Sequence, residues 1–188
     1  MADLVDKTNL IHMAEESRSA FRILSNSSNE ARNLALECLS DSLANNNAAI
    51  LEANKAFVSN EIPVGAVLVD NDSKKIISRK YNQMNYYNNA VKHCEITLIS
   101  ETCEKLKQKY LKNMTLFVTL EPCSMCASAM SEVHLNSLYF GAYDEKKGGI
   151  EKIRIAFQQK NIHVPDIYGG IMEDKCSKLL KDFFRKIR

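Results

Sequence analysis

The sequence predicts a three-layer α/β fold, and three observations support that prediction. Short apolar runs rich in β-branched residues recur after residue 60, as expected of buried strands. Between them lie stretches whose apolar residues recur at the three- and four-residue steps of an amphipathic helix. Strands that alternate with helices are typical of a sheet covered on both faces. The length of 188 residues suits one ordinary domain with room for an appendage.

After residue 60 the strands and helices are expected in a definite order. Strands are predicted at 62–69, 75–79, 115–120, 136–141 and 162–164. Helices are predicted at 91–108, directly after Pro122, and at 171–187. Residues 81–90 hold Asn and Tyr without periodicity and predict a loop. Asn82 opens this loop directly after a strand, where loops reach into functional sites.

The N-terminal part predicts helices and no strand. Apolar residues recur at helical spacing through residues 8–54. Ser and Asn runs at 25–29 and 45–47 predict breaks, so that a last helix of this part is expected at about 48–58. We therefore expect a helical extension, residues 1–47, followed by a second domain, residues 48–188.

Composition excludes several classes of protein. Apolar residues make up 45% of the chain and charged residues 26%, as in a soluble globular protein. No apolar run approaches 18 residues, so no membrane partner is expected, and the N-terminus lacks the pattern of a secretion signal. Six Cys in such a chain indicate a reducing, cytoplasmic compartment and metal binding in place of disulfides. Residues 1–50 carry a net charge of −3 and residues 51–188 one of +5, which permits a nucleic-acid partner without requiring one.

Two short motifs carry the predicted chemistry. The first motif is His93-Cys94-Glu95. The second is Pro122-Cys123-Ser124-Met125-Cys126, in which Cys123 lies 30 residues after His93. Imidazole nitrogen and thiolate sulfur suit Zn²⁺, and a catalytic zinc keeps its fourth position for water, so His93, Cys123 and Cys126 are the predicted ligands. Glu95 is then free to move the protons of the water that the metal activates. The order H-x-E, then P-C-x-x-C, is the signature of zinc-dependent base deaminases.

The expected secondary structure suits these roles. Cys123 and Cys126 are three residues apart, so they share one face of the helix after Pro122, and the positive helix N-terminus favours their thiolates. His93 and Glu95 fall near the first turn of the 91–108 helix. Two residues apart, they do not share a face, which fits their different tasks.

The same residue types also fit other kinds of site. The second motif also fits a structural zinc knuckle or a thioredoxin-like redox pair, but a structural zinc site would need a fourth Cys or His, and the nearby Cys94 and Cys103 lie in no paired motif. The loop at 144–149, with two Lys and two Gly, suits either a phosphate contact or a solvated turn. No zinc role is expected for the remaining candidates, which are His12, Cys38, His134, His163 and Cys176.

From Phe57 to Arg188 the chain resembles the bacterial tRNA-specific adenosine deaminases. The matching stretches are Glu61-Ile62-Pro63-Val64-Gly65-Ala66-Val67, His93-x-Glu95-Ile96, Thr119-Leu120-Glu121-Pro122-Cys123-x-Met125-Cys126, Gly141-Ala142-x-Asp144 and Phe183-Phe184-Arg185. The resemblance implies the cytidine-deaminase fold with a mixed five-stranded sheet, a homodimer, and conversion of adenosine to inosine at the wobble position of a tRNA anticodon. It also implies that Asn82 contacts the flipped base, and that no nucleotide cofactor is needed. Lys92 and Cys94 depart from the family, which usually has a small or apolar residue before the His and Ala after it.

Residues 8–54 have a different resemblance. The run Ser19-Ala20-Phe21, Leu24, Asn33-x-Ala35-Leu36, Leu43-x-x-Asn46 and Ile50-Leu51-x-Ala53-Asn54 is similar to the start of γ-glutamyl phosphate reductase. The nicotinamide site and catalytic cysteine of that family lie far downstream of this region and have no match here. We therefore expect a fusion or replacement of the N-terminus without reductase activity.

Two alternative functions stay open at this point. One is a deaminase of a free base or nucleoside such as cytosine or guanine, which would use the same zinc motifs without RNA. The other is a zinc-stabilised RNA-binding protein whose catalysis the N-terminal extension has disabled. Both an active deaminase and this second alternative would contain zinc, so a measurement of turnover, and not of metal content, distinguishes them.

Overall fold

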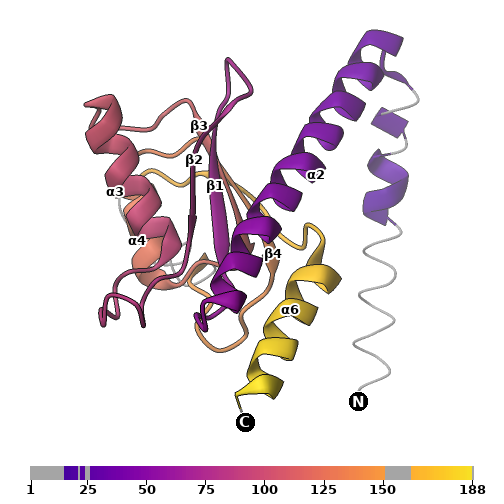
Figure 1. Cartoon of the computed structure of the whole chain (residues 1–188). Helices are drawn as coiled ribbons and strands as arrows, with labels where there is room; N and C mark the ends of the chain where they lie inside the picture. The colour runs from indigo at the N-terminus through magenta and orange to yellow at the C-terminus, as the bar shows by residue number, and fades with distance from the viewer. Residues whose placement is uncertain (1–14, 21, 24–25, 151–161, 188) are drawn as a thin grey trace. The chain divides into compact units, whose positions relative to one another are not determined.

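The computed structural model describes residues 15–20, 22–23, 26–150 and 162–187. The chain divides into two compact units, residues 1–41 and 42–188. Named helices and strands are, in chain order, α2 (Asn29–Val58), β1 (Gly65–Asp70), β2 (Ile76–Tyr81), α3 (Cys94–Leu106), β3 (Met114–Leu120), α4 (Ser124–Glu132), β4 (Ser137–Ala142), β5 (Asp166–Tyr168) and α6 (Glu173–Lys186) (Figure 1).

The second unit is built on a mixed five-stranded sheet in the order β2-β1-β3-β4-β5. β1 is antiparallel to β2 and β3, whereas β3, β4 and β5 run parallel. The parallel strands are linked through α4 and through the chain that follows β4. The predicted α/β class and the mixed five-stranded sheet are therefore confirmed.

One face of the sheet packs on α3 and α4 (Figure 1). Ala66 and Leu68 of β1 point to this side and join a buried cluster with Leu98 of α3 and Met130 of α4. Because side chains alternate along a strand, the neighbouring Val67 contributes to the opposite face. The cluster places the first turns of α3 and α4 side by side, and both motifs lie at these turns.

The other face packs on the second half of α2 and on α6. Ala48 and Ala49 of α2 are buried against β1 and β3. A Cβ at Gly65 would collide with the α2 backbone, so glycine is what allows the helix to approach the strand. Phe57 of α2 and Phe183 of α6 meet edge to face, with ring centroids 5.7 Å apart. Helices on both faces complete the three layers.

Two predicted element boundaries are wrong. The Asn run at 45–47 does not break the helix, because α2 is continuous from Asn29 to Val58. Asn46 is buried, and its Nδ2 donates to the Ser42 carbonyl at 2.9 Å. The side chain thus finds its hydrogen-bond partner within the helix and does not form a cap that would end it. The last strand is Asp166–Tyr168 and not 162–164, because it pairs in register with Ser137–Tyr139 of β4.

The expected domain boundary between residues 47 and 48 stays a prediction, as does the likeness of residues 8–54 to a reductase. Residues 8–14, and with them His12, lie outside the described part of the chain. Within the described residues, no helix is both long and apolar enough to cross a membrane.

Candidate active site

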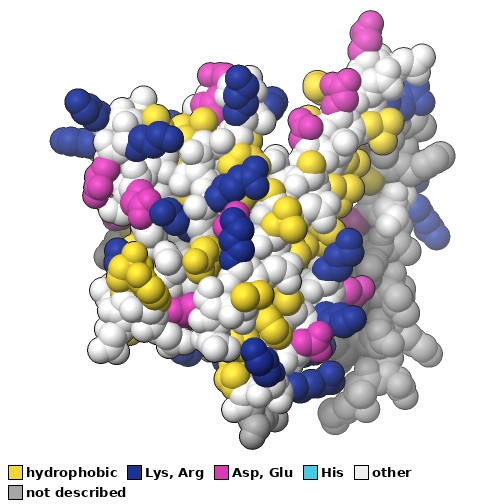
Figure 2. Space-filling model, in the orientation of Figure 1, with side chains coloured by type: hydrophobic (Ala, Val, Ile, Leu, Met, Phe, Trp, Pro, Cys, Tyr) yellow, Lys and Arg dark blue, Asp and Glu magenta, His cyan; other side chains and the backbone are white. Residues whose placement is uncertain are grey.

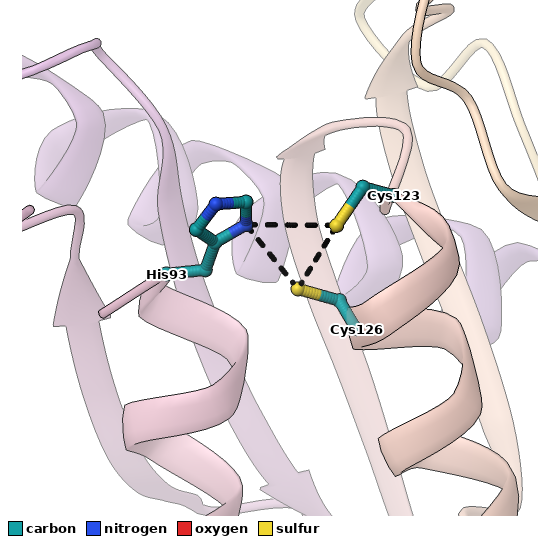
Figure 3. Close-up of side chains that lie close together, drawn as sticks. All are labelled: His93, Cys123 and Cys126. Atoms are coloured by element: carbon teal, nitrogen blue, oxygen red, sulfur yellow. Dashed lines mark hydrogen bonds between the residues drawn. The ribbon is translucent and has the colours of Figure 1, made fainter. Parts of the chain in front are cut away.

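His93, Cys123 and Cys126 come together at the start of two helices (Figure 3). The Nδ1 atom of His93 lies 3.7 Å from Sγ of Cys123 and 3.4 Å from Sγ of Cys126, and the two sulfur atoms are 3.7 Å apart. Ideal tetrahedral zinc, with bonds of about 2.3 Å to sulfur and about 2.05 Å to nitrogen, separates its ligands by about 3.8 Å (S···S) and about 3.6 Å (N···S). The three donors therefore fit a tetrahedral ion, and they are the metal-compatible group found among the described residues.

Local backbone geometry explains why these side chains converge. His93 and Cys123 are the residues that precede α3 and α4, and both have extended backbone angles. Each therefore turns away from its helix axis, while Cys126 lies one turn further along α4. The sequence-based placement of all three at helix starts is consistent with this geometry.

Hydrogen bonding sets the protonation of the cluster. The hydrogen bonds of Cys123 with Cys126 and His93 lower the pKa of the Cys123 thiol to about 3. The hydrogen bond between Cys123 and His93 raises the pKa of His93. The hydrogen bond between Cys123 and Cys126, together with burial, raises the pKa of the Cys126 thiol. The three groups thus share protons, which a Zn²⁺ ion would displace, because zinc binds cysteine as thiolate.

Glu95 lies in the first turn of α3 and is 4% exposed. Burial raises the pKa of its carboxyl group, as expected for a charge moved out of water. Its charge acts on His93 and on Cys126, so the carboxylate is part of the same electrostatic site. Cys94 is fully buried, and its thiol donates to Oε2 of Glu95 at 3.2 Å.

Asn82 is buried beside the start of α3. Its Oδ1 accepts a hydrogen bond from the Cys94 N–H at 3.0 Å, and its own N–H donates to the Val64 carbonyl at 3.0 Å. Because the amide oxygen is occupied, the side chain presents its Nδ2 donor, for which no described residue is the acceptor. The loop position inferred from the sequence therefore places Asn82 next to the motif residues.

Glu121 is a residue of this region that the sequence analysis did not single out. Its carboxylate accepts the N–H groups of Asp144 at 3.1 Å and of Ile150 at 3.4 Å. The loop between these two residues passes over the start of α4, where Gly148 pairs with Cys123 and Gly149 donates to the Pro122 carbonyl at 2.9 Å. A carboxylate directly before a Pro-Cys motif is the signal that could have revealed it.

The loop at 144–149 borders the candidate site. The hydrogen bond with Cys123 raises the pKa of His93, and the positive charge of Lys147 opposes this shift without reversing it, so this lysine acts on the cluster. The N–H groups of Lys146 and Lys147 are held by Oδ1 of Asp144, each at 3.0 Å. A phosphate contact by these lysines stays a prediction.

The other sequence candidates lie elsewhere. His134 and His163 stack on each other with ring centroids 5.1 Å apart, and Nε2 of His163 bonds the Leu135 carbonyl. Cys176 is buried under Gly141 and Cys38 is exposed. A cavity of about 570 Å³ also opens beside β4 and β5, and its lining includes Glu121 and Ile150.

The sheet topology and the convergence of these helix starts define the class of cytidine-deaminase-like deaminases. Comparison with known proteins agrees, because a family model described as MafB19-like deaminase matches residues 41–188. The chain belongs to the tRNA-specific adenosine deaminases within this class. A protein of that name from Rickettsia bellii is 45% identical over 141 residues, which cover 74% of this chain and 97% of the relative.

Solved structures show the same relationship. A structure from a study of A-to-I editing by tRNA:A34 deaminases at the wobble position of transfer RNA is 39% identical and superposes with a TM-score of 0.66, covering 71% of this chain and 96% of that chain. Guanine deaminase from Nitrosomonas europaea has a TM-score of 0.64 at 17% identity, covering 75% of this chain and 83% of that one. The second likeness shows a shared fold alone.

Proposed function

We propose that the protein is a zinc-dependent hydrolase that converts adenosine to inosine at the wobble position of a tRNA anticodon. The observation that carries the proposal is the tetrahedral spacing of His93 Nδ1, Cys123 Sγ and Cys126 Sγ beside a buried carboxylate. Family membership supplies the substrate, since the relatives are named for tRNA and adenosine.

His93, Cys123 and Cys126 would hold the zinc. When bound there, Zn²⁺ would supply a water of lowered pKa at neutral pH. Three protein ligands leave one tetrahedral position open, which distinguishes a catalytic site from a closed structural one. The chemistry of the donor set thus agrees with a hydrolytic reaction.

Glu95 is the proposed general base and acid. Its carboxylate takes one proton from the attacking water and delivers it to the ring nitrogen as the water oxygen adds to C6 of adenine. It then takes the second proton from the added hydroxyl and delivers it to the amine, which departs as ammonia. Burial supports this role, because a raised carboxyl pKa makes the protonated form a usable intermediate in the transfer. General acid–base catalysis of this kind contributes about 10²- to 10⁴-fold in rate.

Asn82 is the proposed contact to the flipped base. The hydrogen bond from Cys94 N–H fixes the orientation of the amide, so Nδ2 is available to donate to an acceptor on the adenine ring. An anticodon loop suits this arrangement, since its bases are unpaired and cost little to extrude.

A homodimer and a cytoplasmic location belong to the same proposal. Both rest on the family resemblance, and the location also rests on the substrate, because tRNA is processed where it is made and used. The free-base alternative shares the fold, as the likeness to guanine deaminase illustrates. Only an assay that compares RNA with free bases as substrates can therefore distinguish this alternative from the proposed function.

Substitution of Glu95 by Ala tests the proposal. The zinc-loaded wild type should form inosine in an anticodon stem–loop with adenosine at the wobble position, and Glu95→Ala should lose at least about 10²-fold in kcat while retaining one zinc per chain. Glu132→Ala, which removes an exposed carboxylate at the end of α4, serves as the matched control. Undiminished turnover by Glu95→Ala would refute the assigned role, and turnover of free guanine or cytosine without turnover of the stem–loop would refute the substrate.

A further inference from the structure

The loop that joins Asn82 to His93 has both ends in the candidate site. Asn82 contacts the start of α3, and His93 is the residue that precedes this helix. Backbone hydrogen bonds fold the intervening chain, among them Tyr87 N–H to the Gln83 carbonyl at 3.2 Å. The loop therefore borders the candidate site at both of its ends.

The buried carboxylate of Glu61 holds the backbone of this loop in place. Glu61 is 2% exposed, and its two oxygens accept the N–H groups of Asn85 at 3.1 Å and of Tyr86 at 2.7 Å. Asn85 adds a second tie, because its Nδ2 donates to the Asn60 carbonyl at 3.0 Å. The proposed reaction makes no use of Glu61. Its evident effect is to hold the backbone at Tyr86 in one position.

The anchored segment presents aromatic rings to solvent. The side chains of Tyr86 and Tyr87 are 76% and 52% exposed, and their rings meet at right angles with centroids 4.8 Å apart. Nζ of Lys92 lies 5.4 Å from the centroid of the Tyr87 ring, within the range of a cation–π contact. Tyr87 thus lies between a cation and the more open ring of Tyr86.

We propose that Tyr86, Tyr87 and Lys92 form a binding platform for the single-stranded nucleotides that flank the target base of the RNA substrate. The ring of Tyr86 stacks on a neighbouring base, Tyr87 orients that ring, and Lys92 contacts a phosphate. This inference rests on the proposed function. It specifies which residues beside the candidate active site bind the RNA substrate.

The chemistry of the platform favours RNA over a protein partner. Unpaired bases are recognised by stacking on aromatic rings next to cationic side chains, and any base offers a π-face. On the face seen in Figure 2, Lys and Arg are interspersed with Asp and Glu and form no broad basic patch. Lys92 directly precedes the predicted metal ligand His93, so the cation of the platform belongs to a residue next to the candidate site.

The chain offers a matched control for this platform. Tyr110 is 49% exposed, and Nζ of Lys112 lies 5.5 Å from its ring centroid, which reproduces the Tyr87–Lys92 pair. It lies beyond the C-terminal end of α3, and the 13 residues of that helix span about 20 Å. Tyr110→Ala therefore removes a comparable ring far from the candidate site.

The experiment uses the zinc-loaded full chain and an anticodon stem–loop with 2-aminopurine beside the wobble adenosine. Tyr86→Ala should raise both Kd and KM about tenfold, with kcat changed less than about twofold, and should abolish quenching of the 2-aminopurine fluorescence. Tyr86→Phe should retain wild-type values, and Tyr110→Ala should not differ from wild type. Lys92→Gln should reduce the slope of log Kd against log salt by about 0.7, the loss of one phosphate contact with a single strand.

Each contrary outcome is distinct. Unchanged Kd and KM in Tyr86→Ala, with inosine formed by the wild type, would overturn the platform and leave the proposed function standing. Reduced RNA binding by Tyr86→Ala, with no inosine from the wild type, would support the platform and refute the proposed function. A fall in molar mass from dimer to monomer in Tyr86→Ala would overturn the platform, because the rings would then belong to a subunit interface.

Discussion

Removal of the Glu121 carboxylate should loosen the loop that covers the start of α4. The Glu121 oxygens accept two backbone N–H groups, from Asp144 at 3.1 Å and from Ile150 at 3.4 Å. Hydrogen bonds to charged groups contribute about 1.5–3 kcal/mol each, and the longer of these two bonds belongs at the low end. Glu121→Ala should therefore lower the free energy of unfolding by about 3–4.5 kcal/mol, and Glu121→Gln by about half as much, since one amide oxygen still accepts.

The same change should weaken metal binding, because this loop pairs with Cys123 through Gly148. Partners outside the ligand shell typically change metal affinity 10- to 100-fold, and Glu121 acts through the loop, so we expect about tenfold. Urea unfolding of the zinc-loaded protein and competition with a chelator measure the two effects. Glu145→Gln, an exposed carboxylate of the same loop, is the control and should stay within about 0.5 kcal/mol of wild type. Equal stability and zinc affinity in the Glu121 and Glu145 variants would refute the reasoning.

Three further predictions follow from packing, metal binding and charge. Gly65→Ala forces a methyl group into the α2 backbone and should cost about 3 kcal/mol or more in urea unfolding; a cost below about 1 kcal/mol would contradict the close contact. Cys126→Ser should abolish stoichiometric zinc binding, as measured by elemental analysis, and chelation of the wild type should lower its Tm to that of the variant. The Ser73 N–H lowers the pKa of the Asp70 carboxylate, so this group stabilises the fold above its unfolded pKa and the effect is lost as pH falls through the lowered folded value. Asp70→Asn should accordingly lower Tm at pH 7 and converge with wild type in strong acid. Asp72→Asn, at an exposed residue of the same turn, is the control and should leave Tm at pH 7 close to that of wild type.

The sequence was most informative where local patterns coincide with tertiary structure. The buried strands that became β1 and β3 were predictable, because their apolar runs are short, β-branched and bounded by polar turns. The placement of His93 and Cys123 at helix starts followed from residue spacing and from Pro122. These features depend on neighbours in the chain, which a single sequence displays directly.

Features decided by distant contacts escaped prediction. The Asn run in α2 indicates a helix end by propensity, yet Asn46 is buried and bonded within the helix, so burial outweighed the local preference. The last strand was misplaced because only pairing with β4 selects Asp166–Tyr168. The carboxylates of Glu61 and Glu121 hold loops 23 to 29 residues away in the chain, and no local pattern connects them with those loops.

Inosine formation in RNA tests the central claim most directly. The zinc-loaded full chain would be incubated with an anticodon stem–loop that carries adenosine at the wobble position and elsewhere in the loop, and the product nucleosides would be mapped by position. The proposed function predicts inosine at the wobble position alone, with none formed after chelation of the metal. Absence of inosine from the zinc-loaded protein, together with release of ammonia from a free base, would contradict it.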